Sequence, residues 1–394
     1  MSLRDNFIYL PALLMDMSTG SAILGVTFFA SRLGASPLTI GVMASINTVL
    51  YVLLCQVFGK LSDRSNRKRF PQIACFSFAV LYLFMPFCTS LKQLIIFFPL
   101  TGVTLSALWP AMEAWIGEQG DGRSLVKRVS MFNLFWTGGL MLGYVSGGYI
   151  YDLNVSAPFY FAGIFALCST VIISIQPGPA NGAREGLQVG RPSDMSQLSL
   201  NRQLAAKYLN ISRVANFASW LTLGIMRYIF PKLIYEMGVA PRVFGLLMLC
   251  QAGAQFVMFF VLGTTEKWHY RFSPLLVFQI LAVISFASIW LVGSPVLWAF
   301  ALMLFGLNTG MTYSSSMYYS LCGHLDLGGK SAWHESVIHT GVFFSTLIGG
   351  ALANYVGLKS PYLFCAAAIV AGLPVQIFIL RRNNNESGRL RPCP

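Results

Sequence analysis

Long apolar runs alternate with short polar connections along the whole chain. A helix needs roughly twenty apolar residues to cross the ~30 Å hydrocarbon core of a bilayer. Twelve runs reach about this length: 7–31, 36–58, 70–90, 94–116, 129–151, 158–176, 208–235, 242–263, 273–293, 296–320, 334–356 and 361–380. We therefore predict an all-α membrane protein with twelve transmembrane helices. The first run exceeds signal-peptide length, so we expect it to be retained.

The composition agrees with this pattern. Of 394 residues, 55% are apolar and 10% are charged, whereas soluble domains have roughly 45–50% and 25%. A disordered chain, a coiled coil and a small disulfide scaffold are excluded. The eight cysteines include no CxxC pair, and we interpret them as free thiols.

The net charge of +13 raises the alternative of a nucleic-acid partner, which needs a clustered basic face. Twenty of the 27 Lys and Arg residues instead fall in alternate connections or tails, and only five fall at the opposite ends of the helices. Basic residues concentrate on the cytoplasmic side of a membrane. We therefore expect both termini to be cytoplasmic, and no nucleic-acid partner. Short loops and tails fit a plasma membrane, the inner membrane of a bacterium.

Two features divide the chain into halves. The polar segment 177–207 predicts a cytoplasmic linker between bundles at 1–176 and 208–380, with a tail at 381–394. The small residues Gly139, Gly143, Gly147 and Gly148 recur 202 positions later as Gly341, Ser345, Gly349 and Gly350. Such spacing permits close helix packing in lipid, and repeated six-helix halves are a transporter architecture.

The connection after the second run reads Gly59-Lys60-Leu61-Ser62-Asp63-Arg64-Ser65-Asn66-Arg67-Lys68-Arg69. It resembles the cytoplasmic motif G-x-L-x-D-R-x-G-R-R/K of the major facilitator superfamily, and it stands at the same place in the chain. Asn66 replaces the second glycine, and Asn tolerates the left-handed conformation well. The resemblance implies two pseudo-symmetric six-helix bundles and secondary active transport by alternating access.

The resemblance also implies a gate made of Gly59, Asp63, Arg64 and Arg67. Asp63 would meet the start of the eleventh span near 331–335, with His334 and Glu335 in its first turn. Arg67 would pair with Glu113 or Glu118, and these contacts would hold an outward-open state. The alternative is that the basic cluster only fixes topology. Tyr144 stands where the family's antiporter motif has proline, which weakens an interpretation as a proton/drug antiporter.

Polar residues within lipid-depth helices usually face a cavity or a partner. The third, sixth, ninth and twelfth runs contain no Asp, Glu, Lys, Arg, His or Asn, so we predict that they face lipid. The remaining runs would line a central path. Their candidate substrate or coupling residues are Asp16, Asn47, Tyr51, Asn133, Asn216, Trp220, Arg227, Gln251, Asn308 and Tyr319.

Two hypotheses concern charged members of this set. Asp16, close to the expected midplane, is a candidate proton-coupling acid, because burial disfavours a charged carboxylate. Arg227 is a candidate for holding an anionic group of the substrate, because its guanidinium is always charged. The alternative is a structural ion pair between Asp16 and Arg227, or separate backbone partners for each.

Other mechanisms find less support. No GxxxxGK[ST] loop is present, so ATP is not expected to drive the protein. His334-Glu335-x3-His339 is not HExxH, and its histidines lie about 140° apart on a helix. The sequence thus predicts a monomeric transporter of a small organic solute, embedded in membrane lipids, with proton coupling as a hypothesis and no metal or cofactor. A lipid flippase of the same fold and a membrane-embedded metalloenzyme using His334, Glu335 and His339 are the alternatives.

Overall fold

The computed structural model describes residues 7–117, 125–176, 195–321 and 327–382, and within these ranges it contains helices and short connections only. The elements are η1 (Phe7–Tyr9), α2 (Leu10–Arg32), α3 (Pro37–Arg64), α4 (Arg69–Phe84), η2 (Met85–Phe87), α5 (Leu91–Gly117), α6 (Leu125–Leu153), α7 (Ala157–Ile175), α8 (Met195–Tyr228), α9 (Phe230–Glu236), α10 (Pro241–Thr264), α11 (Phe272–Leu291), α12 (Pro295–Leu321), α13 (Leu327–Tyr355) and α14 (Ser360–Arg382).

These helices confirm the twelve expected crossings. Ten of them are long and apolar enough to span a membrane by themselves. The other two crossings are α6, which is rich in glycine, and the consecutive pair α8 and α9, of which α8 carries the internal charges Arg213 and Arg227. The break between α8 and α9 precedes Pro231, which has no backbone N–H to continue the helix.

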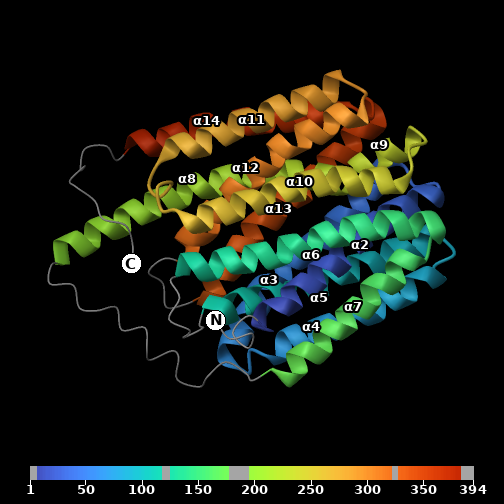
Figure 1. Cartoon of the computed structure of the whole chain (residues 1–394), viewed down its shortest axis with the longest axis horizontal. Helices are drawn as coiled ribbons and strands as arrows, with labels where there is room; N and C mark the ends of the chain where they lie inside the picture. Colours follow the sequence, from blue (N-terminus) through green and yellow to red (C-terminus); the bar gives the residue numbers. More distant parts are fainter. Residues whose placement is uncertain (1–6, 118–124, 177–194, 322–326, 383–394) are drawn as a thin grey trace.

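The largest departure from the expected boundaries concerns α8. This helix begins at Met195, inside the segment 177–207 that the sequence predicts as a linker. Residues 195–207 contain Leu, Gln, Ala, Arg and Lys, which favour helix despite their polarity. Polarity excludes this stretch from a hydrocarbon core but does not prevent a helix from extending beyond it, and Figure 1 shows α8 projecting past its neighbours.

The four runs without strongly polar residues lie at the periphery, as expected. Helices α11 and α14 form one edge of the molecule, and α4 and α7 form the opposite edge (Figure 1). The most apolar stretches of these four helices are 22–39% buried, against 50–72% for the other helices that are apolar enough to cross a membrane by themselves. Each edge pair is joined by polar side chains: Gln279 and Gln376 exchange hydrogen bonds of 3.0 and 2.8 Å, and Gln72 donates to Ser174 at 2.8 Å.

The two halves meet along two seams, α3 against α13 and α6 against α10, which are related by the internal repeat. A Cβ on Gly41 of α3 would lie 2.2 Å from the carbonyl oxygen of Thr346 of α13. A Cβ on Gly245 of α10, the matching helix of the second half, would lie 2.4 Å from the carbonyl oxygen of Tyr144 of α6. Only glycine permits this approach, so both seams require it at equivalent positions.

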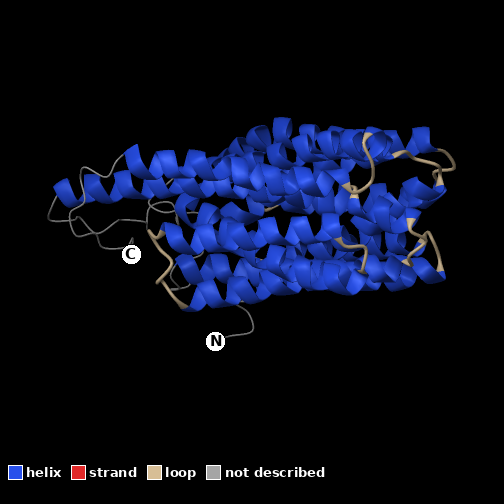
Figure 2. Cartoon of the chain, turned by 90° about the horizontal axis from the view of Figure 1, so that it is seen from above, coloured by secondary structure: helices blue, strands red, loops and turns tan. Residues whose placement is uncertain are grey.

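Both ends of each seam are closed. We call the end with residues 65–68 and 265–271 the Arg64 end, and the end with residues 33–36 and 237–240 the Arg32 end; the helices run between these ends (Figure 2). At the Arg64 end, Cys55 contacts Ser336 at 3.1 Å, and Ser130 donates to the Phe259 carbonyl at 3.0 Å. At the Arg32 end, Gly350 lies against Gly41 and Gly148 lies against Arg242. In this conformation both seams are therefore in contact at both ends.

Candidate functional site

One face of α8 carries a stripe of polar side chains into the middle of the molecule. It consists of Arg213, Asn216, Trp220 and Arg227, as the spacing in the sequence predicts. Each has at least one buried polar atom without a hydrogen-bond partner in the described part of the chain, and Asn216 has two. An unsatisfied buried polar group costs about 1–3 kcal/mol. A ligand that reached this stripe would offset that cost.

The two charged candidates, Asp16 and Arg227, lie near each other at the part of this stripe that is closest to the Arg32 end. The Arg227 guanidinium carbon lies 5.0 Å from the centre of the Trp220 ring, a cation–π arrangement. Asp16, on α2 of the other half, is 8% exposed and interacts electrostatically with Arg227. They do not form an ion pair within 4.0 Å among the described residues. The structural ion pair that the sequence left open is therefore absent in this conformation.

A second polar cluster bridges the halves between the centre and the Arg64 end. Tyr51 of α3 donates a 2.5 Å hydrogen bond to Oε2 of Glu335 on α13, and Tyr313 of α12 donates a 3.3 Å hydrogen bond to Oε1 of Glu113 on α5. The two carboxyl groups also interact electrostatically with each other. His339 stacks on Tyr51 with ring centres 3.6 Å apart. Acids and phenols of both halves thus form one network.

This network corrects the expected place of Glu335 in its helix. Helix α13 begins at Leu327, so Glu335 lies about 12 Å along it and not in its first turn. The sequence suggested otherwise because the first apolar residue, and not the helix start, set the expected boundary of this span. Glu113 accepts a hydrogen bond from Tyr313, and its pairing with Arg67 stays a prediction. Glu118 and the side chain of Ser331 lie outside the described residues.

The motif itself is compact. Arg67 is buried and forms a 2.5 Å ion pair with Asp63, one turn earlier. Lys68 donates to the carbonyl oxygens of Ser174, at 2.8 Å, and Gln176, and so caps the end of α7. Asn66 does not adopt a positive φ, which among described non-glycine residues only Tyr270 does. Its side-chain oxygen instead accepts from the backbone N–H of Lys68 at 3.2 Å, so the turn uses hydrogen bonding where we expected left-handed backbone.

The amide candidates hold each half together. Asn47 of α3 donates to Phe98 and Thr101 of α5, at 3.1 and 2.9 Å. Gln251 of α10, the matching helix of the second half, donates to Thr309 of α12 at 3.0 Å. The bonds of Asn47 lie within the first half, and the bond of Gln251 lies within the second half. Asn308 donates to Ser219 at 3.0 Å and keeps an unpartnered buried oxygen, so it remains available to a ligand.

Tyr319 lies away from the α8 stripe. Its hydroxyl accepts from the backbone N–H of Tyr270 at 2.7 Å, within an aromatic cluster at the Arg64 end that includes Trp268 and His269. Burial lowers the pKa of the His269 imidazole against a smaller opposing effect of Glu266. The ring is therefore neutral at pH 7, which suits its stacking on Tyr318.

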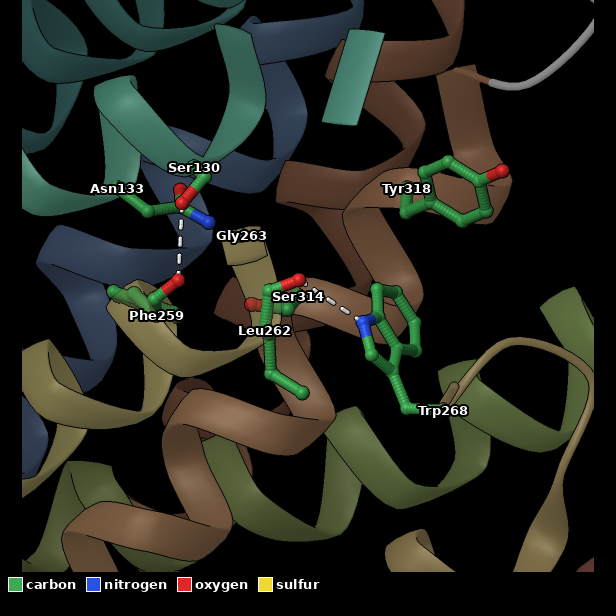
Figure 3. A pocket seen from close by; sticks show the side chains of 8 residues that line it. All are labelled: Ser130, Asn133, Phe259, Leu262, Gly263, Trp268, Ser314 and Tyr318. Carbon is green, nitrogen blue, oxygen red and sulfur yellow. Dashed lines mark hydrogen bonds between the residues drawn. The ribbon is translucent and has the colours of Figure 1, made fainter. Parts of the chain in front are cut away.

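A small pocket opens beside this cluster at the α6–α10 seam (Figure 3). It contains about 250 Å³ of empty space, including some open to solvent, and is lined by Ser130, Asn133, Phe259, Leu262, Gly263, Trp268, Ser314 and Tyr318. The side-chain carbonyl of Asn133 accepts from Trp136 at 3.1 Å, while its NH₂ group is buried and unpartnered. The sequence identified Asn133 but gave no signal for the other lining residues, which come from four separate segments.

The histidines do not build a metal centre in the described part of the chain, where no three His, Cys, Asp or Glu residues cluster suitably. The Nδ1 atom of His334 forms a hydrogen bond with the Ser316 hydroxyl at 3.1 Å. The Nδ1 atom of His339 forms one with the Glu335 backbone carbonyl at 3.0 Å. His324 lies outside the described residues.

Two similar six-helix halves that meet along glycine-lined seams around a buried polar core define a secondary membrane transporter. Comparison with known proteins agrees. The Major Facilitator Superfamily profile matches residues 8–325, and the chain belongs to this superfamily. It is a transporter and not an enzyme.

The chain is 22% identical over 377 residues to an uncharacterised MFS-type transporter of Methanocaldococcus jannaschii, covering 91% of this chain and 95% of that one. It is 22% identical to multidrug resistance protein 1 of Bacillus subtilis over 363 residues, 88% of each. The solved nucleoside transporter NupG superimposes with a TM-score of 0.69 at 11% identity, covering 97% of this chain and all of that one. The last likeness shows the fold alone.

Proposed function

We propose that this transporter moves a small organic solute with an aromatic body and an anionic group, and that it couples this movement to protons. The observation behind this proposal is the α8 stripe, where the Arg227 guanidinium lies over the Trp220 ring and each of the two side chains has a buried nitrogen without a partner. Both are hydrogen-bond donors, and an indole ring offers a flat apolar surface. An aromatic carboxylate matches this pair.

Solute and proton would meet at Asp16. This acid is buried beside Arg227 but does not neutralise it by direct contact. A carboxylate on the solute would therefore compete with Asp16 for the same cation, and the weaker competitor takes up a proton. This competition links solute binding in one half to protonation in the other.

Thermal stability of the detergent-purified protein tests the solute class. The panel contains benzoate, indole-3-acetate, their uncharged amides, and benzylamine. A ligand that binds the folded state raises the melting temperature by mass action. We expect stabilisation by the two carboxylates and not by the amides or the amine, and loss of stabilisation in Arg227→Ala.

Arg242→Ala is the matched control, because Arg242 is exposed at the Arg32 end and contacts Asp152 at 3.7 Å. It should keep the full response to carboxylates. Stabilisation by benzylamine alone, or an unchanged carboxylate response in Arg227→Ala, contradicts the proposed solute class.

The flippase alternative requires a side opening wide enough for an acyl chain. The close packing of α3 on α13 and of α6 on α10 counts against such an opening in this conformation. Solute transport accounts better for a polar stripe enclosed between the halves.

The same proposal includes the placement in the membrane. The basic residues of the Arg64 end support a cytoplasmic position for that end and for both termini, and a bacterial inner membrane is the proposed setting. The bundles 1–176 and 208–380 act as the two moving bodies. One chain supplies the whole α8 stripe together with Asp16, so a monomer suffices.

A further inference from the structure

Asn216 differs from the other members of the α8 stripe because neither end of its side-chain amide is used. Its oxygen and its nitrogen are both buried and have no hydrogen-bond partner among the described residues, and the residue is 0% exposed. An amide can donate and accept at the same time. Because an unpaired buried polar group is unfavourable, a ligand group that both donates and accepts would be bound well here.

A second amide with spare capacity lies close to Asn216. The NH₂ group of Asn308, on α12, donates to the hydroxyl of Ser219 at 3.0 Å, and Ser219 lies one helical turn from Asn216 on α8. The side-chain oxygen of Asn308 is buried and has no partner in the described part of the chain. Helices α8 and α12 thus bring two incompletely bonded amides to the same level of the molecule.

Trp220 lies between Asn216 and Arg227 along the stripe. Long side chains in a helix lean toward its N-terminus, so Arg227 leans toward Trp220 and Trp220 toward Asn216. The first of these contacts is observed, with the guanidinium carbon 5.0 Å from the ring centre. The rings of Tyr313 and His339 approach Trp220 to 5.9 and 6.3 Å between centres, but they are tilted by 41° and 36°. Neither ring therefore covers the indole face by stacking.

We propose that the solute carries a hydroxyl group one aromatic ring away from its carboxylate, and that Asn216 and Asn308 recognise this hydroxyl. The carboxylate binds Arg227, the ring lies along Trp220, and the hydroxyl bonds to the two amides. A hydroxyl suits them because it accepts from an NH₂ group and donates to an amide oxygen. The inference rests on the proposed function, since it adds a second polar group to the same solute.

A second anionic group is the alternative, because Arg213 also belongs to the stripe and has a buried nitrogen without a partner. Its position argues against that role. Arg213 lies 14 residues before Arg227, about 21 Å along the helix axis, and the lean toward the N-terminus carries its side chain away from Trp220. It interacts electrostatically with His334 instead. Asn216 is the nearer polar group.

Thermal stability of the detergent-purified full chain, titrated with each ligand, measures the affinities. The ligands are benzoate, 4-methylbenzoate, 4-hydroxybenzoate and terephthalate. We expect 4-hydroxybenzoate to bind roughly tenfold or more tightly than 4-methylbenzoate, which has the same shape but leaves the buried amides unpaired. Terephthalate, which has a second carboxylate in place of the hydroxyl, should bind more weakly than 4-hydroxybenzoate.

Asn216→Leu removes both hydrogen-bonding atoms at nearly constant volume. It should abolish the preference for the hydroxyl, while 4-methylbenzoate still binds. Asn154→Leu is the matched control, because Asn154 is exposed beyond the end of α6 and its oxygen accepts from the backbone N–H of Ser156 at 2.8 Å; it should keep the wild-type preference. If Asn216→Leu does not fold, Asn216→Ala removes the same atoms and should lose the preference too.

The proposal is overturned if 4-hydroxybenzoate and 4-methylbenzoate bind the wild type equally, or if the preference survives in the Asn216 variant. It is also overturned if terephthalate binds most tightly, which would assign the second group to Arg213. These results are separable from the proposed function. Equal stabilisation by the three monocarboxylates that is lost in Arg227→Ala leaves the proposed function standing without the hydroxyl. A preference for the hydroxyl that persists in Arg227→Ala shows its recognition without the proposed anion site.

Discussion

At the scale of single residues, the centre of this transporter contains charges that are near one another without being neutralised by contact. Asp16 and Arg227 come from opposite halves and interact without an ion pair. A fixed ion pair would bind both groups permanently, because breaking a buried pair is costly. In the proposed transport cycle, this arrangement would let each group change its partner.

Replacing Asp16 by Asn tests whether this acid carries the coupled proton. We expect Asp16→Asn to lose the response of transport to an imposed pH gradient in proteoliposomes, while solute exchange across the membrane continues. The amide keeps the size of the carboxyl group but cannot release a proton. Uptake of radiolabelled benzoate is the readout.

Asp152→Asn provides the control for that experiment. Asp152 lies at the Arg32 end and contacts Arg242, far along the sequence from the stripe. It should respond to the gradient like the wild type. If Asp16→Asn keeps the wild-type pH dependence, Asp16 is not the coupling acid.

At the scale of helices, glycine decides where the halves touch. Gly245 of α10 meets the backbone of Tyr144, whereas Gly253 of the same helix meets only the end of Met141, at 3.7 Å. The two positions share a helix and differ in the room for a methyl group.

We expect Gly245→Ala to lower stability by about 1–3 kcal/mol through overpacking of the seam. Gly253→Ala should be neutral or slightly stabilising, since alanine favours helix over glycine. Unfolding in detergent, followed by tryptophan fluorescence, measures both variants. Equal destabilisation by the two changes would show that close approach at the α6–α10 seam is not the reason for glycine at position 245.

At the scale of the whole molecule, the repeat explains the architecture. Equivalent glycines of the two halves make equivalent contacts, Gly41 to α13 and Gly245 to α6. Each half therefore contributes the same two surfaces to the seams, and rocking one half on the other separates both seams at one end. This symmetry is what alternating access requires.

Protease treatment of oriented vesicles tests topology and domain boundaries together. We expect trypsin to cut at Arg184 or Arg191 in inside-out vesicles and not in right-side-out vesicles. The two fragments should then purify together, because both seams still join them. Lys92, at the Arg32 end, should react with an impermeant amine reagent in right-side-out vesicles and not in inside-out vesicles. Cleavage from the outside would reverse the expected topology, and separation of the fragments would contradict the domain boundaries.

Much of the fold could be predicted from the sequence, because each helix that crosses a bilayer must by itself be long and apolar enough to do so. The length and apolarity of the runs place most helix ends within a few residues of those observed, and the absence of strongly polar residues identifies α4, α7, α11 and α14 as peripheral. The stripe on α8 also follows from spacing alone, since residues three, four and seven apart share a helix face.

The site was predictable only in part. Asn47 and Gln251 were predicted as substrate or coupling residues on the central path, whereas their hydrogen bonds join helices within a single half. Tyr319 has the spacing of a stripe residue but binds a backbone N–H at the Arg64 end. Helical spacing fixes the face on which a residue lies, whereas its partner depends on the neighbouring helix.

The sequence by itself determined the number of spans, their approximate ends, the repeat and the family, because each of these depends on local pattern. Only the tertiary structure decided that Tyr51 and Glu335 meet. They lie far apart along the chain, in different halves, and nothing in either local sequence points to the other. Contacts between distant helices depend on how both halves pack, and the hydrogen bond between these two side chains forms only as a result of that packing.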